Sequence, residues 1–215
     1  MTPELRLAQL RREYTLAGLA ERDLDPDPLR QFQKWFDEAL KAGLVEPNAM
    51  VLATVDKSGQ PSSRLVLLKQ VDARGFVFFT NYGSRKGREL ANNPRAALTF
   101  PWQALERQVC VTGKVGKLSR EESEAYFKLR PRGSRLGANV SRQSAMVSGR
   151  EELERKLEEL EARHPGEDIP TPAEWGGYVL APAEIEFWQG RPNRLHDRLR
   201  YRRQEEKWII ERLSP

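Results

Sequence analysis

Apolar residues spaced three and four positions apart predict two amphipathic helices near the start of the chain. The first covers Glu4–Leu19, and the second covers Pro28–Ala42, where the proline suits a first helical turn. Gly43 directly follows the second helix and is expected to close it, because glycine readily takes the left-handed conformation found there.

Beyond Ala49 the apolar residues recur at every second position, which is typical of β-strands. Turn-forming residues separate these runs, at Asp56–Gly59, Asp72–Gly75 and Asn92–Pro94. Short loops between such strands favour an antiparallel barrel or sandwich, and the helices make the chain α+β. The predicted strands are Met50–Val55, Ser63–Gln70, Phe76–Thr80, Ala96–Phe100, Arg107–Lys117, Gly177–Leu180, Ile185–Gln189, Leu195–Arg203 and Lys207–Leu213.

Two further helices are predicted after the first five strands. Ser119 and Glu122 have the spacing of a capping box, which begins a helix over Arg120–Leu129. A stripe of leucines predicts another over Glu151–Arg163. The stretch Arg130–Gly149 between them is rich in arginine, serine and glycine, so we expect a mobile surface loop or a binding loop.

A candidate anion site lies where the third strand ends. Asn81–Ser84 forms a turn, and a short helix is predicted to begin at Arg85. Free backbone N–H groups at a helix N-terminus, together with Ser84, Arg85 and Lys86, are well suited to an anion such as phosphate.

Composition limits the classes of protein to consider. The 215 residues, 24.7 kDa, suffice for one sizeable core, so a single domain is expected. The net charge of +5 is well mixed along the chain and does not indicate a nucleic-acid binder. Without a secretion signal or a long apolar run, and with Cys110 alone and expected in the core, we predict a cytoplasmic protein with no disulfide and no membrane span.

Several motifs of common cofactor sites are missing from the sequence. It has no G-x-G-x-x-G after a strand, no P-loop, no H-E-x-x-H and no C-x-x-C. His164 and His196 are its only histidines, so no metal site is predicted.

The stretch Ile185–Arg198, I-E-F-W-Q-G-R-P-N-R-L-H-D-R, carries the strongest chemical signal. On an extended chain Arg194, His196 and Arg198 share one face, which suits an anion or a flat ring. The alternative is an exposed strand whose charges are merely solvated. Arg64 and Lys69, six residues apart inclusively, would lie on opposite faces of another strand and could serve two ligands.

This stretch resembles the C-terminal signature of the pyridoxamine (pyridoxine) 5'-phosphate oxidases. Further matching motifs are L-R-R-E-Y at Leu10–Tyr14, R-L-V-L-L-K at Arg64–Lys69, F-V-F-F-T-N-Y-G-S-R-K at Phe76–Lys86, F-P-W-Q-A-L-E-R-Q-V at Phe100–Val109, Y-F-K-L-R-P-R-G-S-R-L-G at Tyr126–Gly137 and S-R-Q-S at Ser141–Ser144. The resemblance implies an FMN-binding split barrel of Greek-key type with peripheral helices, assembled as a homodimer with flavin at the subunit interface. It also implies oxidation of pyridoxamine and pyridoxine 5'-phosphate to pyridoxal 5'-phosphate by O2, releasing H2O2, and ammonia from the amine.

By matched position, the resemblance assigns roles to individual residues. The FMN-binding residues would be Arg64, Leu65, Val66, Leu67, Leu68, Lys69, Phe79, Thr80, Arg85, Lys86, Gln108, Gln143, Ser144, Trp188 and Arg198. The substrate-binding residues would be Arg11, Arg12, Glu13, Tyr14, Lys69, Tyr126, Arg130, Ser134, Arg194, Leu195 and His196. Arg194 and His196 would be catalytic, and residues 1–27 would form an arm that closes over the substrate.

Other functions compete with this interpretation. A split-barrel FMN reductase would not need Arg130, Ser134, Arg194 and His196 together, and all four are present. A carrier of flavin or pyridoxal phosphate would bind its ligand without producing peroxide. A basic nucleic-acid binder would lose affinity steeply with added salt.

Overall fold

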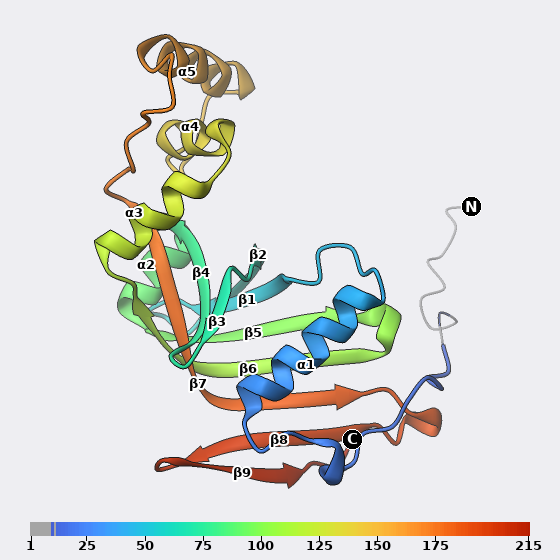
Figure 1. Ribbon diagram of the computed structural model, residues 1–215. Helices are drawn as coiled ribbons and strands as arrows, with labels where there is room; N and C mark the ends of the chain where they lie inside the picture. The colour runs from blue at the N-terminus through green and yellow to red at the C-terminus, as the bar shows by residue number, and fades with distance from the viewer. Residues whose placement is uncertain (1–9, 11) are drawn as a thin grey trace, which may run out of the picture. The chain divides into compact units, whose positions relative to one another are not determined.

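The computed structural model describes residue 10 and residues 12–215, which fall into two compact units (Figure 1). The central unit comprises residues 48–99 and 111–183. The terminal unit comprises the described residues up to 47, residues 100–110 and residues 184–215. Organisation as a single domain stays a prediction.

The central unit contains the first strands and most of the helices. Its complete elements are β1 (Ala49–Val55), β2 (Pro61–Leu67), β3 (Gln70–Asp72), β4 (Gly75–Asn81), α2 (Arg85–Asn92), α3 (Arg120–Leu129), α4 (Arg132–Val140) and α5 (Arg150–Arg163). Parts of β5 (Arg95–Trp102), β6 (Arg107–Lys117) and β7 (Trp175–Gln189) also belong to it. β1 pairs with β2 over their whole length, and Phe78 of β4 lies opposite Tyr178 of β7.

The terminal unit contains α1 (Pro28–Lys41), β8 (Asp197–Gln204) and β9 (Lys207–Arg212), together with the other ends of β5, β6 and β7. Asp27 caps α1 by accepting a hydrogen bond from the Leu29 N–H, and Pro28 occupies the first turn as predicted. Gly43 follows with a φ of +69°, which confirms its predicted role. The core of this unit is aromatic, with Phe32, Trp35, Phe100, Phe187 and Tyr201 all buried.

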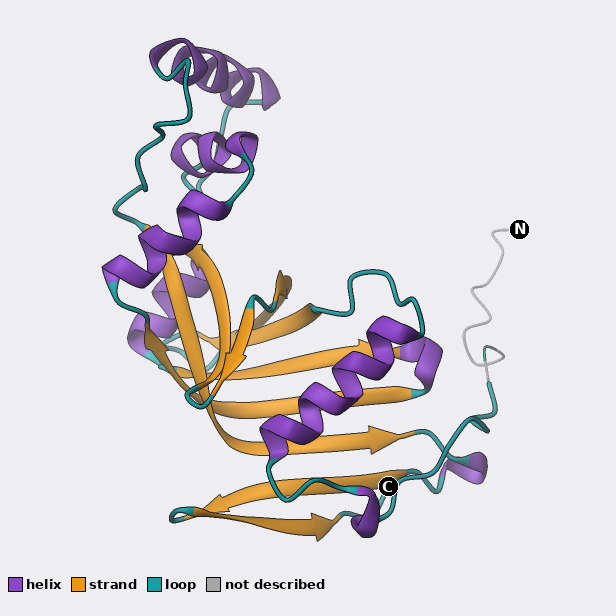
Figure 2. Cartoon of the chain, viewed as in Figure 1, coloured by secondary structure: helices purple, strands orange, loops and turns teal. Residues whose placement is uncertain are grey.

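The strand order is β2-β1-β5-β6-β7-β4-β3, with β8 paired to β7 and β9 paired to β8. The pairings of β1 with β2 and β5, of β4 with β3 and β7, and of β8 with β7 and β9 are antiparallel. This is an antiparallel split-barrel sheet with peripheral helices (Figure 2), which confirms the predicted α+β class.

Three predicted strands are divided or joined differently in the structure. Ser63–Gln70 is divided into β2 and β3, because the Leu68 N–H donates to Asn48 and the Lys69 N–H donates to Val77 on β4. Between Leu68 and Lys69, the chain therefore stops pairing next to β1 and begins to pair with β4. Conversely, the predicted strands Gly177–Leu180 and Ile185–Gln189 are parts of the single strand β7.

The prediction that Arg130–Gly149 is a loop is wrong in part, because α4 occupies Arg132–Val140. The N–H groups of Ser134 and Arg135 donate to the Pro131 carbonyl and start the helix. Leu136 is fully buried and packs with Phe127, Ile169 and Trp175 in one hydrophobic cluster. A single deeply buried leucine leaves no periodic apolar pattern in the sequence. α5 follows α4 in contact with it (Figure 2), and none of its residues is fully buried.

The predicted helix Glu4–Leu19 lies partly outside the described residues, and its described part, residue 10 and residues 12–19, is not helical. The Leu16 N–H donates to the Glu106 carboxylate at 3.0 Å, and the Leu19 N–H donates to the Asp197 carboxylate at 3.0 Å. Distant side chains thus take up backbone donors that a helix would use internally, and this part of the predicted helix is wrong.

Candidate functional site

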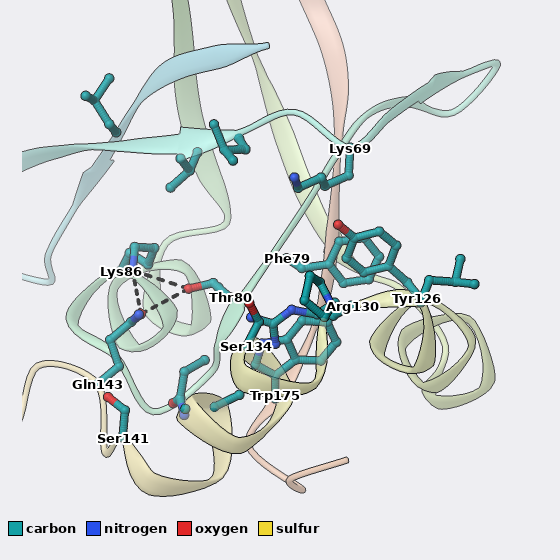
Figure 3. Close-up of a pocket in the computed structure, with 18 residues that line it drawn as sticks. Lys69, Phe79, Thr80, Lys86, Tyr126, Arg130, Ser134, Ser141, Gln143 and Trp175 are labelled. Carbon is teal, nitrogen blue, oxygen red and sulfur yellow. Dashed lines mark hydrogen bonds between the residues drawn. The ribbon is translucent and has the colours of Figure 1, made fainter. Parts of the chain in front are cut away.

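A cavity of about 640 Å³ lies within the central unit (Figure 3). This volume is within the range of roughly 300–1,000 Å³ that ligand pockets occupy. The cavity brings together eleven residues predicted to bind cofactor or substrate: Leu65, Val66, Leu67, Lys69, Phe79, Thr80, Lys86, Tyr126, Arg130, Ser134 and Gln143.

Three parallel aromatic rings form one wall of this cavity. Phe79 of β4 stacks on Tyr126 of α3, with centroids 4.0 Å apart, and on Trp175 of β7, with centroids 5.3 Å apart. Trp175 was not among the predicted site residues, because it begins a strand far along the chain and matches none of the motifs. The stacked rings offer a flat apolar surface.

Arg130 follows α3 and lies beside this wall (Figure 3). Its guanidinium is 4.9 Å from the Trp175 ring centroid and 5.5 Å from that of Phe127. Its Nη1 atom is buried and has no hydrogen-bond partner among the described residues. Burial lowers the pKa of Arg130, although a guanidinium stays charged. A buried cation with an unsatisfied donor is a strong candidate for contact with an anionic ligand.

Lys86 on α2 reaches the opposite side of the cavity (Figure 3). Its ammonium group donates to Thr80 at 3.2 Å and to Gln143 at 2.8 Å. Burial lowers the pKa of Lys86, and the nearby charge of Arg64 lowers it further. Ser84 caps α2 by accepting from the Gly87 N–H, as expected for the predicted helix start.

Seven predicted cofactor-binding residues do not line this cavity. Arg64, Leu68, Arg85 and Ser144 belong to the central unit, and Gln108, Trp188 and Arg198 belong to the terminal unit. The Ser144 hydroxyl accepts from the Arg85 N–H at 3.1 Å. Arg64 bonds to hydroxyl groups on β1 and β2, and Lys69 lies beyond the end of β2. The prediction that Arg64 and Lys69 alternate along one strand is therefore wrong.

The terminal unit contains a second cavity, of about 380 Å³. The predicted site residues Arg12, Tyr14, Gln108 and Trp188 line it. The Tyr14 ring lies 5.7 Å from both Trp188 and His196, and the latter two rings are 4.6 Å apart. Arg11 lies outside the described residues, and Glu13 is exposed.

Cys110 is partly exposed, so the prediction of a core role is wrong. Its neighbours Val109 and Val111 are buried on the other face of β6. The Cys110 sulfur lies 3.2 Å from the Gln108 amide nitrogen.

The predicted alternation of Arg194, His196 and Arg198 is also wrong, because β8 begins only at Asp197. The turn continues through Pro192–Arg194, and Arg194 has a φ of +61°. Arg194 and Leu195 are exposed, whereas Arg198 makes a two-pronged ion pair with Glu186 at 2.7 and 2.9 Å. The turn that begins in G-R-P-N therefore continues through Arg194, beyond the residues whose types indicate a turn.

Asp197, next to His196, fixes the described part of the N-terminal segment. Its carboxylate accepts from the Leu19 N–H at 3.0 Å and from Arg212 at 2.7 Å. Arg191 lies 3.5 Å from the same carboxylate and donates to the Ala17 carbonyl. The segment carrying Arg12 and Tyr14 is therefore tied to the strand that follows His196.

His196 has a defined tautomer. The Arg191 N–H donates to its Nδ1 at 3.1 Å, so the ring proton resides on Nε2. Burial lowers the pKa of His196, and the Arg194 charge lowers it further. The imidazole is therefore neutral at neutral pH and offers one donor, Nε2–H.

We expect nitrogen-detected NMR to show His196 as the Nε2–H tautomer at pH 7, with a pKa below its ordinary value of 6.5. The chain has two histidines, so a His164→Gln variant assigns the resonances. An Nδ1–H tautomer, or a pKa above 6.5, would contradict the described hydrogen bond.

Within residue 10 and residues 12–215, no cluster of three His, Cys, Asp or Glu side chains is arranged to hold a metal ion. In the same part of the chain, no helix has the length and apolar character needed to cross a membrane.

The fold and the cavity define a class of split-barrel proteins with a cationic, aromatic-walled pocket for a small ligand. A family model described as pyridoxamine 5'-phosphate oxidase matches residues 36–164. A second, described as the pyridoxine 5'-phosphate oxidase C-terminal dimerisation region, matches residues 175–215. The chain belongs to the pyridoxine/pyridoxamine 5'-phosphate oxidase family and is an oxidoreductase, as the resemblance predicted.

Relatives support this placement along nearly the whole chain. A pyridoxine/pyridoxamine 5'-phosphate oxidase of Rubrobacter xylanophilus is 63% identical over 209 residues, covering 97% of this chain and 96% of its own. That of Cupriavidus necator is 60% identical over 210 residues, covering 97% and 99%. The crystal structure of PhzG from Burkholderia lata, in complex with tetrahydrophenazine-1-carboxylic acid, is 32% identical with a TM-score of 0.88, covering 93% and 99%.

Proposed function

We propose that the chain binds FMN and oxidises pyridoxamine and pyridoxine 5'-phosphate to pyridoxal 5'-phosphate. O2 accepts the electrons and is released as H2O2, and the amine substrate also yields ammonia. The observation that carries this proposal is the buried Nη1 of Arg130, which has no hydrogen-bond partner among the described residues and lies in a cavity with an aromatic wall. The high identity to relatives named for these two substrates supports it.

The residues present fit FMN. Arg64, Arg85 and Lys86 cluster at the start of α2, where they suit the flavin phosphate. Gln108, Trp188 and Arg198 of the terminal unit suit the polar edge and rim of the ring system. When bound, FMN supplies an acceptor for a hydride from the substrate carbon that becomes the aldehyde.

The chain's own residues would bind and orient the substrate. Arg130, Lys69 and Ser134 offer two cations and a hydroxyl to its phosphate, and Tyr126 adds a ring to the wall. Arg194 would position the pyridine ring and balance its charge, while neutral His196 would donate from Nε2. Orientation of the reacting carbon is then the main contribution of the protein to the rate.

Assembly as a homodimer, with flavin at the interface, completes the proposal. One set of predicted site residues lines a cavity in the central unit and another lines a cavity in the terminal unit. The match of residues 175–215 to a dimerisation region supports assembly of two copies. Residues 12–14 would belong to the arm that closes over the substrate.

An anaerobic experiment tests the function. Protein reconstituted with FMN is mixed with pyridoxamine 5'-phosphate, flavin bleaching is followed, and air is then admitted. We expect bleaching, followed by recovery of the yellow colour with pyridoxal 5'-phosphate and peroxide as products. A yellow protein that never bleaches would reject the substrates and favour a split-barrel reductase or a flavin carrier.

We expect Arg194→Ala to slow anaerobic flavin reduction by roughly tenfold to a hundredfold at saturating substrate, because the substrate loses a positioning contact. Stopped-flow absorbance measures this rate directly. Arg203→Ala removes another exposed arginine of the terminal unit and should leave the rate unchanged. A normal rate in Arg194→Ala would remove this residue from the catalytic set.

A further inference from the structure

A buried carboxylate lies among the cations at the start of α2. Glu89 is only 4% exposed. Its Oε2 accepts from the hydroxyls of Thr54 and Ser62, at 2.5 and 2.6 Å, and lies 3.4 Å from an Arg64 nitrogen. Its Oε1 accepts from the Arg85 Nε at 2.8 Å. One side chain therefore binds both arginines of the predicted phosphate site.

The same two hydroxyls also hold Arg64. The Thr54 hydroxyl is 2.5 Å from Nη1 of Arg64, and the Ser62 hydroxyl is 2.5 Å from Nη2. Nη1 also donates to the Leu52 carbonyl at 3.3 Å, so several bonds fix Arg64, and Glu89 is the one anion among its described partners. Arg85 differs, because its described hydrogen bond to Glu89 uses Nε, and both terminal nitrogens stay available for a ligand.

The charges of this cluster suit a phosphate ester. Burial by itself would raise the pKa of Glu89, but the bonds from Ser62, Thr54 and Arg85 and the charge of Arg64 lower it to about 2. Glu89 is therefore ionised throughout the physiological range. Arg64, Arg85 and Lys86 bring three positive charges to this cluster, which Glu89 and, near Arg85, Asp56 offset only in part. A phosphate monoester carries about −1.5 to −2 at neutral pH.

We propose that Glu89 is a positioning residue for the phosphate end of the flavin: it aims Arg64 and Arg85 without touching the ligand. This inference rests on the proposed function, because it takes FMN as the cofactor. A carboxylate facing a phosphate would repel it, so Glu89 acts through the two guanidinium groups, whose fixed geometry saves ordering entropy on binding. The residue was not predicted from the sequence, because it belongs to no motif of the resemblance.

A comparison of FMN with riboflavin tests the role, since the two flavins differ only by the phosphate. Kd values for both are measured by flavin fluorescence for the unaltered protein, E89Q and the control E211Q. Glu211 also bridges two arginines, Arg200 and Arg202, but it lies on β9 in the terminal unit. We expect E89Q to reduce the preference for FMN over riboflavin roughly tenfold, as for the loss of a charged hydrogen bond, and to leave the riboflavin Kd unchanged.

Each outcome has a defined meaning. If E89Q keeps or increases the preference for FMN, the positioning role is overturned. If the unaltered protein does not distinguish FMN from riboflavin, the proposed phosphate site itself is rejected, whatever E89Q does. If E211Q lowers the preference equally, the effect is not specific to the α2 cluster and the inference is overturned.

Two further variants cover the case in which E89Q does not fold. E89D keeps the charge on a shorter side chain and should lower the preference for FMN severalfold, and an unchanged preference would overturn the proposal. In an Arg85→Ala background, E89D should change the preference less than it does alone, because one of the two arginines that it positions is gone. Equal effects in both backgrounds would count against action through Arg85.

Discussion

Arg130→Ala should raise the KM for pyridoxamine 5'-phosphate by about tenfold to a hundredfold, with a much smaller change in the rate of flavin reduction at saturation. The expected loss is roughly 1.5 to 3 kcal/mol, that of a hydrogen bond to a charged group. The buried Nη1 of Arg130 has no partner among the described residues, and the proposed function assigns the substrate phosphate to it as acceptor. Steady-state assays of peroxide release measure the change.

Lys128→Ala is the matched control, because it removes an exposed cation from the last turn of α3, two residues before Arg130. Its KM should match that of the unaltered protein. An unchanged KM in Arg130→Ala would refute the phosphate role. Urea denaturation of both variants separates lost binding from lost packing, because Arg130 also covers the Trp175 ring.

Gly113→Ala should destabilise the protein by about 3 kcal/mol, at the upper end for an overpacked site. A Cβ at Gly113 on β6 would lie 2.1 Å from the Ala181 carbonyl oxygen on β7. The clashing atom belongs to the backbone, so relief requires β6 and β7 to move apart. The lower free energy of unfolding is measured by urea denaturation.

Gly116→Ala provides the comparison, because this glycine lies on the same strand and a Cβ there would meet nothing within 4 Å. It should be neutral or slightly stabilising, since alanine restricts the unfolded chain more than glycine does. Equal stability of the two variants would show that the close approach at Gly113 carries no energetic cost.

Local chemistry was predicted well from the sequence. Pro28 and Gly43 marked the start and end of α1, and the capping box of Ser119 and Glu122 marked the start of α3. The alternation of buried Ile185 and Phe187 placed the end of β7. Each of these predictions depends only on residues that are close together in the sequence, so contacts with distant segments did not change the outcome.

The wrong predictions concern segments whose structure depends on contacts with residues far away in the sequence. The segment 12–19 is held by Glu106 and Asp197, which are far along the chain. The motifs named many of the residues that line the cavity. They included neither Trp175 of its wall nor Glu89 on α2, because strands and helices that meet in three dimensions place these two residues. The resemblance identified candidate site residues, whereas neighbouring groups such as Trp175 and Glu89 became evident only in the three-dimensional structure.

The exposed position of α5 has a consequence for motion at the cavity. Its charged residues pair along the helix, as in Arg150 with Glu154 and Arg155 with Glu159, and such pairs contribute little and weaken with salt. Within α5, Leu157 and Leu160 are the hydrophobic residues that pack against the cluster containing Trp175. The amides of α5 should therefore exchange with deuterium through local opening, well before those of β4 and β7, and faster as ionic strength rises. Each local opening of α5 exposes one side of the hydrophobic cluster that contains Trp175. We therefore expect the opening rate of α5 to determine how often the aromatic wall of the cavity becomes mobile.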